Sequence, residues 1–180
     1  MIRKSPHVSD RRDFGAFANF HGATLAVEVG VDQGNFAAQF MSQWRGDKMY
    51  LVDPYLNTPG SFMHDREWDM QCVMHNLGRH RSRCRFIRAK SVDAFALIRD
   101  KDRGQAGFVY IDGDHSYAAV KVDLPTWWPM VRGGGIFAGH DWNWEGVAKA
   151  VTEFAEGLGL DIYYTHEQEN KGPSWYILKP

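Results

Sequence analysis

Two short polar runs in this sequence hold the residue types that acid–base or metal chemistry requires. The first is 112–117 (DGDHSY) and the second starts at His140 and Asp141, and each follows an apolar, strand-like stretch. Carboxylates that meet in a crevice repel each other unless they are protonated, paired with a base or bridged by a cation. We therefore expect Asp112 and Asp141 to be catalytic, with a divalent ion such as Mg²⁺ as a natural partner of both carboxylates.

The first run also supplies a candidate general base. His115 follows Asp112 by three residues, and an imidazole beside a polarised hydroxyl commonly accepts its proton near neutral pH. Asp114 or Ser116 would equally serve as the cap of a helix that starts near Tyr117. His140 has an alternative explanation too, as a hydrogen-bonded histidine at the end of a strand.

A glycine-bearing turn, 28–34 (EVGVDQG), suits a nucleoside ligand, because its two glycines allow close approach of backbone and ligand. A dinucleotide fingerprint would need another glycine at Val31 or Asp32, and the Asp32 carboxylate disfavours a phosphate. Asp53 ends the next strand, where a carboxylate can accept both hydroxyls of a ribose. Either feature alone also occurs in ordinary turns, so the pairing of the two is the informative observation.

The elements that must position these residues alternate between strand and helix. Period-two or continuous apolar patterns predict strands at 25–30, 48–53, 84–87, 107–112, 136–139, 161–165 and 174–178. Helical spacing predicts helices at 35–44, 65–77, 91–100, 117–131 and 146–156, with a short helix or turn at 14–20. We expect Pro125 to kink or restart one of them. The alternation indicates a doubly wound α/β fold with a mostly parallel sheet and an antiparallel pair at its end.

Ligands in open α/β sheets bind beyond the carboxyl ends of the strands. The predicted tips are 28–34, 53–55, 90–91, 112–117 and 139–144, and each of them carries polar residues. We expect these five tips to converge on one crevice.

Composition limits the class of protein. The chain has 180 residues, 44% hydrophobic residues and a formal net charge of −1, so we expect one domain, 1–180, with a lead-in at 1–24. Nucleic acid is not an expected partner, and the basic run 79–90 is a solvated face or a local phosphate contact. The two cysteines have no metal-ligand spacing and no apolar run is long enough to cross a bilayer, so a cytoplasmic protein is expected.

The runs 27–34, 51–54, 110–117 and 133–142 together resemble class I S-adenosylmethionine-dependent methyltransferases. Within that superfamily the sequence is most similar to the group related to macrocin and catechol O-methyltransferases, from about residue 25 to the C-terminus. The resemblance implies a Rossmann-like, seven-stranded sheet with a reversed terminal strand. It also implies methyl transfer to a small-molecule acceptor, for which a hydroxyl oxygen is preferred over nitrogen.

The resemblance further implies which residues bind the cofactor S-adenosylmethionine. They are Glu28, Gly30, Asp32, Gln33, Gly34, Asp53, Ser91 and Asp112. Asp53 would hold the ribose and Ser91 would lie beside the adenine.

In catechol-type relatives, acids matching Asp112 and Asp141 bind magnesium, and a lysine matching His115 is the base. Their third metal ligand is an asparagine directly after the second acid, where this chain has Trp142. His140 is then a candidate metal ligand or base in its place. These departures leave the metal requirement open.

Two other functions share these features. A domain of this kind could bind S-adenosylmethionine or a partner protein without catalysis, because fold alone does not fix function. An NAD-dependent oxidoreductase would share the architecture, but the three-glycine fingerprint is missing. The sequence leaves the acceptor open, and it also leaves open a homo-oligomer in which a neighbouring subunit lends a lid.

Overall fold

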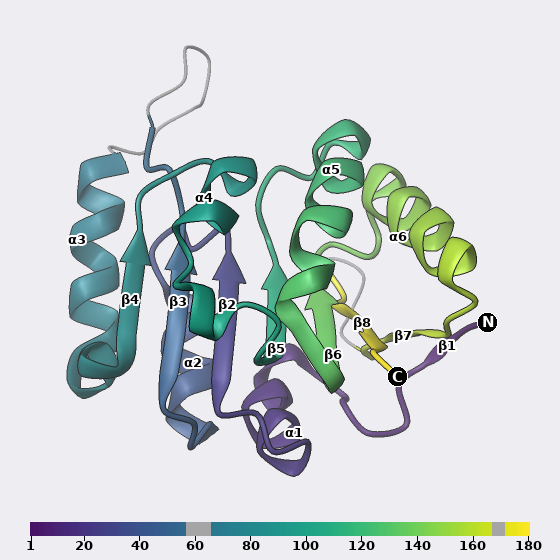
Figure 1. The fold of residues 1–180 in the computed structure, drawn as a ribbon, viewed down its shortest axis with the longest axis horizontal. Coiled ribbons are helices and arrows are strands. Elements are labelled where there is room, and N and C mark those ends of the chain that lie inside the picture. The colour runs from purple at the N-terminus through teal and green to yellow at the C-terminus, as the bar shows by residue number, and fades with distance from the viewer. Residues whose placement is uncertain (57–65, 167–171) are drawn as a thin grey trace.

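One eight-stranded sheet runs through the computed structural model, which describes residues 1–56, 66–166 and 172–180 (Figure 1). The strands are β1 (Ile2–Lys4), β2 (Leu25–Val29), β3 (Lys48–Val52), β4 (Cys84–Ile87), β5 (Ala106–Ile111), β6 (Val131–Gly139), β7 (Ile162–Tyr164) and β8 (Trp175–Leu178). The helices are α1 (Phe14–Phe20), α2 (Asn35–Gln43), α3 (Arg66–Leu77), α4 (Ser91–Leu97), α5 (Tyr117–Trp127) and α6 (Glu145–Leu158). Short 3-10 helices lie at Arg11–Asp13, Gly78–Arg83, Asp100–Asp102 and Trp128–Met130.

The strand order is β1-β7-β8-β6-β5-β2-β3-β4. Every neighbouring pair is parallel except that β8 runs antiparallel to both β6 and β7. The mostly parallel, doubly wound sheet with a reversed terminal strand is therefore confirmed. The sheet has eight strands rather than the predicted seven, because β1 adds to β7 through backbone pairing.

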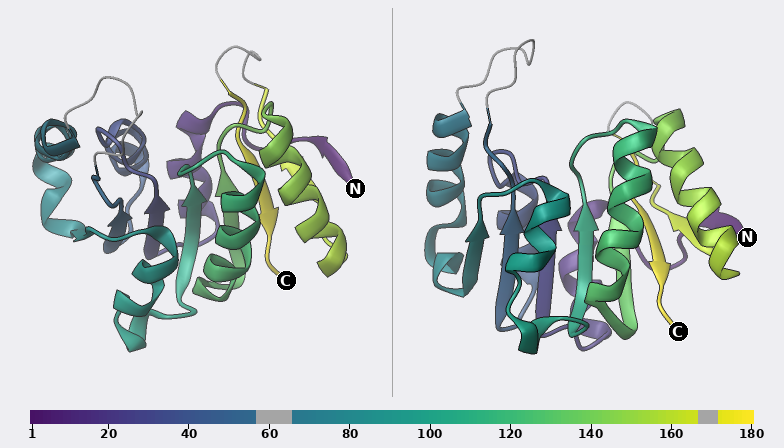
Figure 2. Two further views of the ribbon diagram at one scale, coloured as in Figure 1. Left: turned by 90° about the horizontal axis from the view of Figure 1, so that it is seen from above. Right: turned by 45° about the horizontal axis from the view of Figure 1, so that its top comes forward.

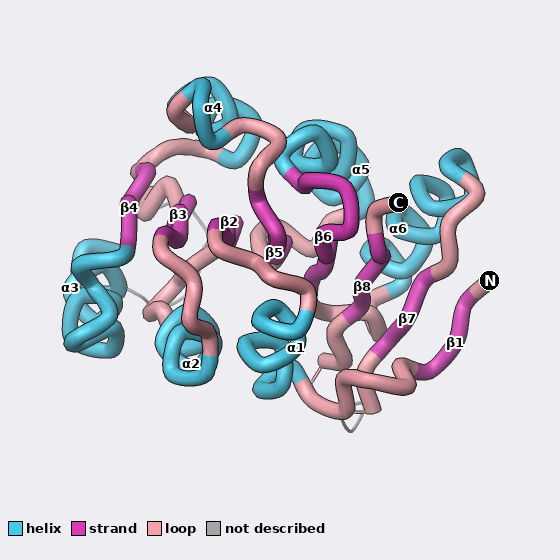
Figure 3. Tube along the Cα trace, turned by 60° about the horizontal axis from the view of Figure 1, so that its bottom comes forward, coloured by secondary structure: helices cyan, strands magenta, loops and turns pink. Residues whose placement is uncertain are grey.

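Helices cover both faces of the sheet, with α1, α2 and α3 on one face and α4, α5 and α6 on the other (Figures 2 and 3). Successive side chains of a strand point to opposite faces, so the central strands are buried on both sides. In β2, Val27 and Val29 enter the core under α4 to α6, whereas Ala26 enters the core under α1 to α3. This burial holds the carboxyl ends of the central strands in fixed positions.

The observed elements differ from the predicted bounds in identifiable places. α5 tolerates Pro125 inside the helix and ends at Trp127, after which a 3-10 turn leads into β6. β6 begins at Val131, five residues before the predicted start at 136, and its pairing with β5 shifts register between Ala106 and Phe108. The predicted start of one helix, Asp65, lies outside the described residues. None of the described helices has the length and hydropathy needed to cross a membrane.

Candidate active site

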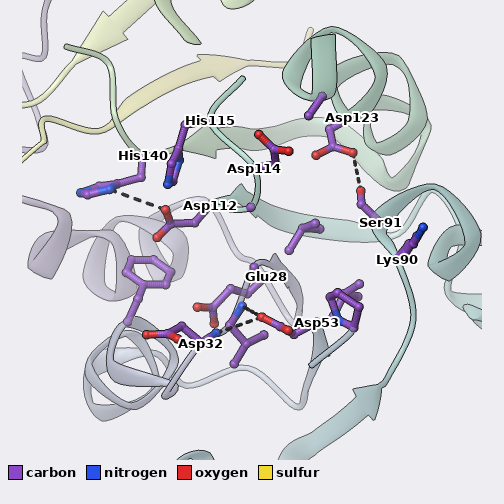
Figure 4. A pocket seen from close by; sticks show the side chains of 18 of the residues that line it. Glu28, Asp32, Asp53, Lys90, Ser91, Asp112, Asp114, His115, Asp123 and His140 are labelled. Atoms are coloured by element: carbon purple, nitrogen blue, oxygen red, sulfur yellow. Dashed lines mark hydrogen bonds and ion pairs between the residues drawn. The ribbon is translucent and has the colours of Figure 1, made fainter. Parts of the chain in front are cut away.

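The tips of neighbouring strands open into one cleft with a volume of about 970 Å³ (Figure 4). Predicted site residues that line it are Glu28, Gly30, Asp32, Asp53, Ser91, Asp112, His115, His140 and Asp141. They come from the ends of β2, β3, β5 and β6 and from the start of α4. Parallel strands place their carboxyl ends at one edge of the sheet, which is why segments distant in sequence meet here.

Gln33 and Gly34 do not line this cleft. The Gln33 amide donates to Asp69 Oδ1 of α3 at 3.0 Å. Gly34 has a φ of 73°, and a Cβ there would lie 3.1 Å from Val73 Cγ1. Both residues therefore hold α3 against the first turn.

Gly30 allows two strand tips to approach each other. Its φ is 87°, and a Cβ at this position would lie only 2.0 Å from the carbonyl oxygen of Asp112. The glycine thus allows the β2 and β5 tips to make close contact, and it also lets a ligand approach the backbone. Asp32 and Asp141 also have positive φ values, 49° and 56°, a conformation that aspartate adopts more readily than most residues.

Asp53, at the end of β3, forms hydrogen bonds to the turn 28–34 that follows β2. Its buried carboxylate accepts hydrogen bonds at Oδ2 from the backbone N–H groups of Val31 (3.0 Å) and Asp32 (3.1 Å). The Arg66 guanidinium of α3 lies 3.2 Å from Asp53 Oδ1 and also contacts Asp32 and Asp69. The Tyr55 backbone N–H also donates to Oδ1 at 2.8 Å, so Asp53 is already engaged by one cation and three backbone amides at the edge of the cleft.

Glu28 supplies a carboxyl group at the base of the cleft. The residue is 1% exposed, and its Oε2 has no hydrogen-bond partner among the described residues. Burial, together with the nearby Asp112 carboxylate, raises the pKa of Glu28 well above its ordinary value. An unpartnered buried oxygen that lines a cleft suits a ligand that donates hydrogen bonds or carries positive charge.

Asp141 joins two imidazoles beside Asp112. Its Oδ2 accepts from His115 Nδ1 at 2.9 Å and its Oδ1 from His140 Nδ1 at 3.0 Å. Arg11 Nη1 lies 3.2 Å from His140 Nε2. A guanidinium can only donate, so His140 accepts at Nε2 and carries its proton on Nδ1.

This network sets the protonation of its members. The hydrogen bond to Asp141 raises the pKa of His115 above its ordinary value. Burial opposes ionisation of Asp141, but the hydrogen bonds from both imidazoles outweigh burial and hold its pKa well below the usual range. Burial raises the pKa of Asp112 to about 6, although the nearby His140 acts in the opposite direction. Two neighbouring aspartates thus have very different proton affinities.

The donor atoms of Asp112, His115 and Asp141 all lie within 4.8 Å of one another, the geometry of a possible metal site within the described residues. A carboxylate offers about four lone-pair positions, so Asp141 can accept both imidazole N–H groups and still bind a cation. His140 is outside this group, and its two nitrogens lie within hydrogen-bond distance of Asp141 and Arg11. Trp142 stacks on Tyr164, with ring centroids 6.1 Å apart. The residues fit a divalent cation held mainly by two carboxylates.

A family model described as a methyltransferase domain matches residues 27–142, more than half of the chain. The matched range includes the tips of β2, β3, β5 and β6. The chain belongs to the methyltransferase domain family. A search of curated proteins gave no match to the sequence of this methyltransferase.

Solved structures of O-methyltransferases share the fold of this methyltransferase. TomG from Streptomyces achromogenes, involved in tomaymycin synthesis and solved with S-adenosylmethionine, has a TM-score of 0.71 at 9% identity over 94% of this chain and 79% of its own. The Bacillus cereus O-methyltransferase, solved with S-adenosylhomocysteine, has a TM-score of 0.65 at 14% identity over 97% of this chain and 84% of its own. Such likeness establishes the Rossmann-like methyltransferase fold.

Three charged residues of the methyltransferase cleft were not among the predicted ones: Arg11, Arg66 and Asp123. Arg11 belongs to a 3-10 helix before the first central strand, and Arg66 and Asp123 lie on α3 and α5. None follows a strand tip, so the rule that located the other residues does not reach them. Asp123 lies at helical spacing from the apolar Val120 and Trp127, and an acid on that apolar face is the one sequence signal that could have drawn attention to it.

Proposed function

We propose that this methyltransferase binds S-adenosylmethionine in the cleft and transfers its methyl group to a hydroxyl oxygen of a small molecule. The observation that carries the proposal is the charge of the cleft. Among the described residues, seven acidic groups line it, Glu28, Asp32, Asp53, Asp112, Asp114, Asp123 and Asp141, against the three cations Arg11, Arg66 and Lys90. Such a surface favours a cationic sulfonium and opposes the pyrophosphate of NAD or a nucleic acid backbone.

Individual residues fit parts of that cofactor. The unpartnered Glu28 oxygen would accept from the ammonium group of the methionine portion, and Asp53 would accept from the ribose hydroxyls. Arg66 now lies against the Asp53 carboxylate, so ribose binding would share or replace that contact. The two O-methyltransferase structures solved with S-adenosylmethionine and S-adenosylhomocysteine support this assignment through their shared fold.

The reaction needs alignment and removal of one proton. The acceptor oxygen attacks the methyl carbon in line with the carbon–sulfur bond, which breaks as the oxygen–carbon bond forms and leaves neutral S-adenosylhomocysteine. Asp141 holds the Nδ1–H of His115 at 2.9 Å and fixes its tautomer. His115 Nε2 therefore takes the hydroxyl proton, and the Asp141 carboxylate stabilises the imidazolium that results.

We propose that Asp112 and Asp141 would hold a divalent cation in the same place. When bound, such an ion lowers the pKa of a coordinated hydroxyl. Titration of the protein with Mg²⁺ and with Mn²⁺ tests the site, and Asp141→Asn is expected to weaken binding of either ion at least tenfold. Unchanged affinity in the variant would remove Asp141 from the ligand set.

The function itself is tested by incubating the protein with S-adenosylmethionine and a panel of phenolic and sugar hydroxyl acceptors. We expect S-adenosylhomocysteine to form only in the presence of an acceptor. Tight S-adenosylmethionine binding without turnover on any acceptor would favour a non-catalytic binding domain, and binding of NAD instead would favour an oxidoreductase.

The ribose assignment has a matched control at the other end of β3. Asp53→Asn is expected to weaken S-adenosylhomocysteine binding about tenfold or more, because an amide offers one acceptor oxygen where a carboxylate offers two. Asp47→Asn changes an exposed residue just before β3 and is expected to leave affinity unaltered. Calorimetric titration of both variants decides the point, and equal affinities would refute the ribose role of Asp53.

We also propose that residues 1–180 act as one domain in the cytoplasm. Strands from both ends of the chain lie side by side in one sheet, and Cys72 and Cys84 are both free thiols. A single cooperative unfolding transition and recovery of the protein in the cytoplasmic fraction are the expected results.

A further inference from the structure

A cavity much smaller than the cleft adjoins the same strand tips. The space that it leaves for the centre of a water molecule is about 10 Å³. A single water needs a space of about 10–15 Å³, so the cavity is of the size of one molecule. Asp112 and Asp141 belong to its polar side, whereas Val120 of α5 and Val147 of α6 belong to its apolar side. A small space with polar groups on one side suits water better than an apolar ligand.

The indole ring of Trp175, on β8, forms another wall of this cavity. Trp175 pairs with Gly139 of β6 in the sheet, and a Cβ at Gly139 would lie only 2.5 Å from Trp175 Cζ2. The ring therefore packs directly on the backbone that leads to His140. Phe137 packs against it edge to face, with ring centroids 5.7 Å apart. These contacts hold the indole N–H in one orientation.

This indole N–H is a buried donor. Trp175 is 1% exposed, and its Nε1 has no hydrogen-bond acceptor among the described residues. Buried indole N–H groups usually find a partner, because a buried donor without one is costly. Trp44, which is equally buried, follows the rule and donates to the Ala23 carbonyl at 2.7 Å. A partner for Trp175 Nε1 is therefore to be sought in the adjoining cavity.

The Asp112 carboxyl group offers the other end of such a contact. His140 Nδ1 lies 3.6 Å from Asp112 Oδ1, which is beyond the usual length of a hydrogen bond. Each oxygen of Asp141, by contrast, already accepts from an imidazole, at 2.9 and 3.0 Å. The indole can only donate and a carboxylate can only accept. A water molecule joins two such groups, because its oxygen accepts and its hydrogens donate.

We propose that this cavity binds one water molecule, which accepts from Trp175 Nε1 and donates to the carboxyl group of Asp112. Trp175 is then a positioning residue. Through the water, β8 orients an acid at the tip of β5, although β8 carries none of the predicted site residues. The water site does not depend on the reaction, whereas the positioning role rests on the proposed function, in which Asp112 belongs to the catalytic centre.

The water is tested by NMR on the ¹⁵N-labelled wild-type protein, with both indole resonances identified by sequential assignment. We expect the Trp175 indole N–H to give NOE and ROE cross-peaks to water with opposite signs, which distinguishes a long-lived bound water from proton exchange. The Trp44 N–H is the internal reference, because it donates to a carbonyl and should give neither peak. An assigned Trp175 N–H without these peaks overturns the proposal, and the measurement needs no variant.

The positioning role is tested with Trp175→Phe, which keeps an aromatic ring in the core but removes the N–H. We expect kcat to fall about tenfold, the lower end of the usual effect of losing an outer hydrogen-bond partner at such a site. Affinity for S-adenosylhomocysteine should stay within about twofold of wild type. Trp44→Phe removes an equally buried N–H on the other face of the sheet and should leave kcat unaltered.

A purely structural role would give a different result. Both variants would then lose kcat and unfolding free energy to a similar extent, and this outcome overturns the positioning role, as does an unchanged kcat in Trp175→Phe. If the wild-type protein forms S-adenosylhomocysteine but shows no bound water, the water link is refuted and methyl transfer stands. If it shows the bound water but methylates no acceptor, the proposed function fails and the water site alone stands.

Discussion

The imidazole ring of His115 has a fixed orientation, and its Nε2 atom is available to a substrate. Asp141 accepts from its Nδ1 at 2.9 Å, and the exposed Trp144 ring lies beside it with centroids 5.1 Å apart. An imidazole held this way presents Nε2 as the basic atom. The neighbouring acid, Asp112, is the more easily protonated of the two aspartates, since burial raises its pKa to about 6.

His115→Ala is expected to lower kcat by about 10²- to 10⁴-fold, the usual contribution of a positioned base. Affinity for S-adenosylhomocysteine and for Mn²⁺ should stay within about twofold of wild type, because the proposed role of His115 is proton transfer rather than binding. Steady-state kinetics and titrations measure these quantities, with the exposed His75→Ala of α3 as the control. A parallel loss of metal affinity would instead make His115 a ligand.

The sequence could indicate candidate site residues only where they follow a strand. Glu28, Asp53, Asp112 and Asp141 all belong to strand ends or the turns after them, and the structure brings them into one cleft. Arg66 reaches the site from α3, and no local pattern fixes how a helix is rotated against a turn. Gln33 lies in the predicted turn, but its side chain points to Asp69 because the turn continues directly into α2.

At the scale of elements, the β2 and β5 tips touch through Gly30. Gly30→Ala is expected to lower the free energy of unfolding by about 2–4 kcal/mol, because the new Cβ would overlap the Asp112 carbonyl and the positive φ is unfavourable for alanine. Gly157→Ala, at an exposed position of α6, meets no atom within 4 Å and should stabilise by about 0.5–1 kcal/mol. Urea denaturation of both variants measures the contrast, and equal effects would contradict it.

The contact between β3 and the 3-10 helix Asp100–Asp102 makes a contribution to stability that depends on pH. Lys48 Nζ and Tyr50 Oη of β3 each lie 2.7 Å from Asp102 Oδ2 in the 3-10 helix Asp100–Asp102. Burial raises the Asp102 pKa, but hydrogen bonds from Lys48 and Tyr50 outweigh it, and the pKa is lowered overall. The contribution of Asp102 to stability is therefore present above its unfolded pKa and is lost as pH falls through the folded value.

Asp102→Asn is accordingly expected to cost about 1–3 kcal/mol of unfolding free energy at neutral pH. The difference from wild type should shrink as the pH falls below the ordinary pKa of an aspartate and through the lowered folded value, where the wild-type carboxyl becomes protonated. Denaturant titrations across this range measure it. Asp100→Asn, 93% exposed in the same turn, should change little at any pH, and a pH-independent cost for Asp102→Asn would refute the account.

Apolar patterns predicted the helices and the seven strands from β2 to β8 well, because buried residues recur at regular spacing in these elements. β1 was not predicted, because all three of its residues are exposed and leave no apolar pattern. Its position depends on backbone pairing with β7. The early start of β6 was not predicted either, because three consecutive glycines at 133–135 are typical of a turn, although in the structure they continue the strand.

For the whole molecule, the cleft joins both halves of the sheet, so a ligand there should stabilise the folded chain as a unit. At one hundred times its Kd, S-adenosylhomocysteine is expected to add about 2.7 kcal/mol, which corresponds to a rise in Tm of about 5–10 °C for a chain of this size. Thermal denaturation followed by circular dichroism measures the shift. NAD at the same concentration should give none, and a matching rise with NAD would contradict the assignment.

The reversed strand β8 lies between β6 and β7, although it follows both in the chain. During synthesis on a ribosome, β2, β3, β5 and β6 can pair before β8 has emerged from the exit tunnel. The edge of β6 then has no neighbour on that side until translation is nearly finished, and open edges of this kind recruit other chains. We therefore expect nascent chains stalled before residue 174 to aggregate or recruit chaperones, even though every strand that borders the cleft has already been made.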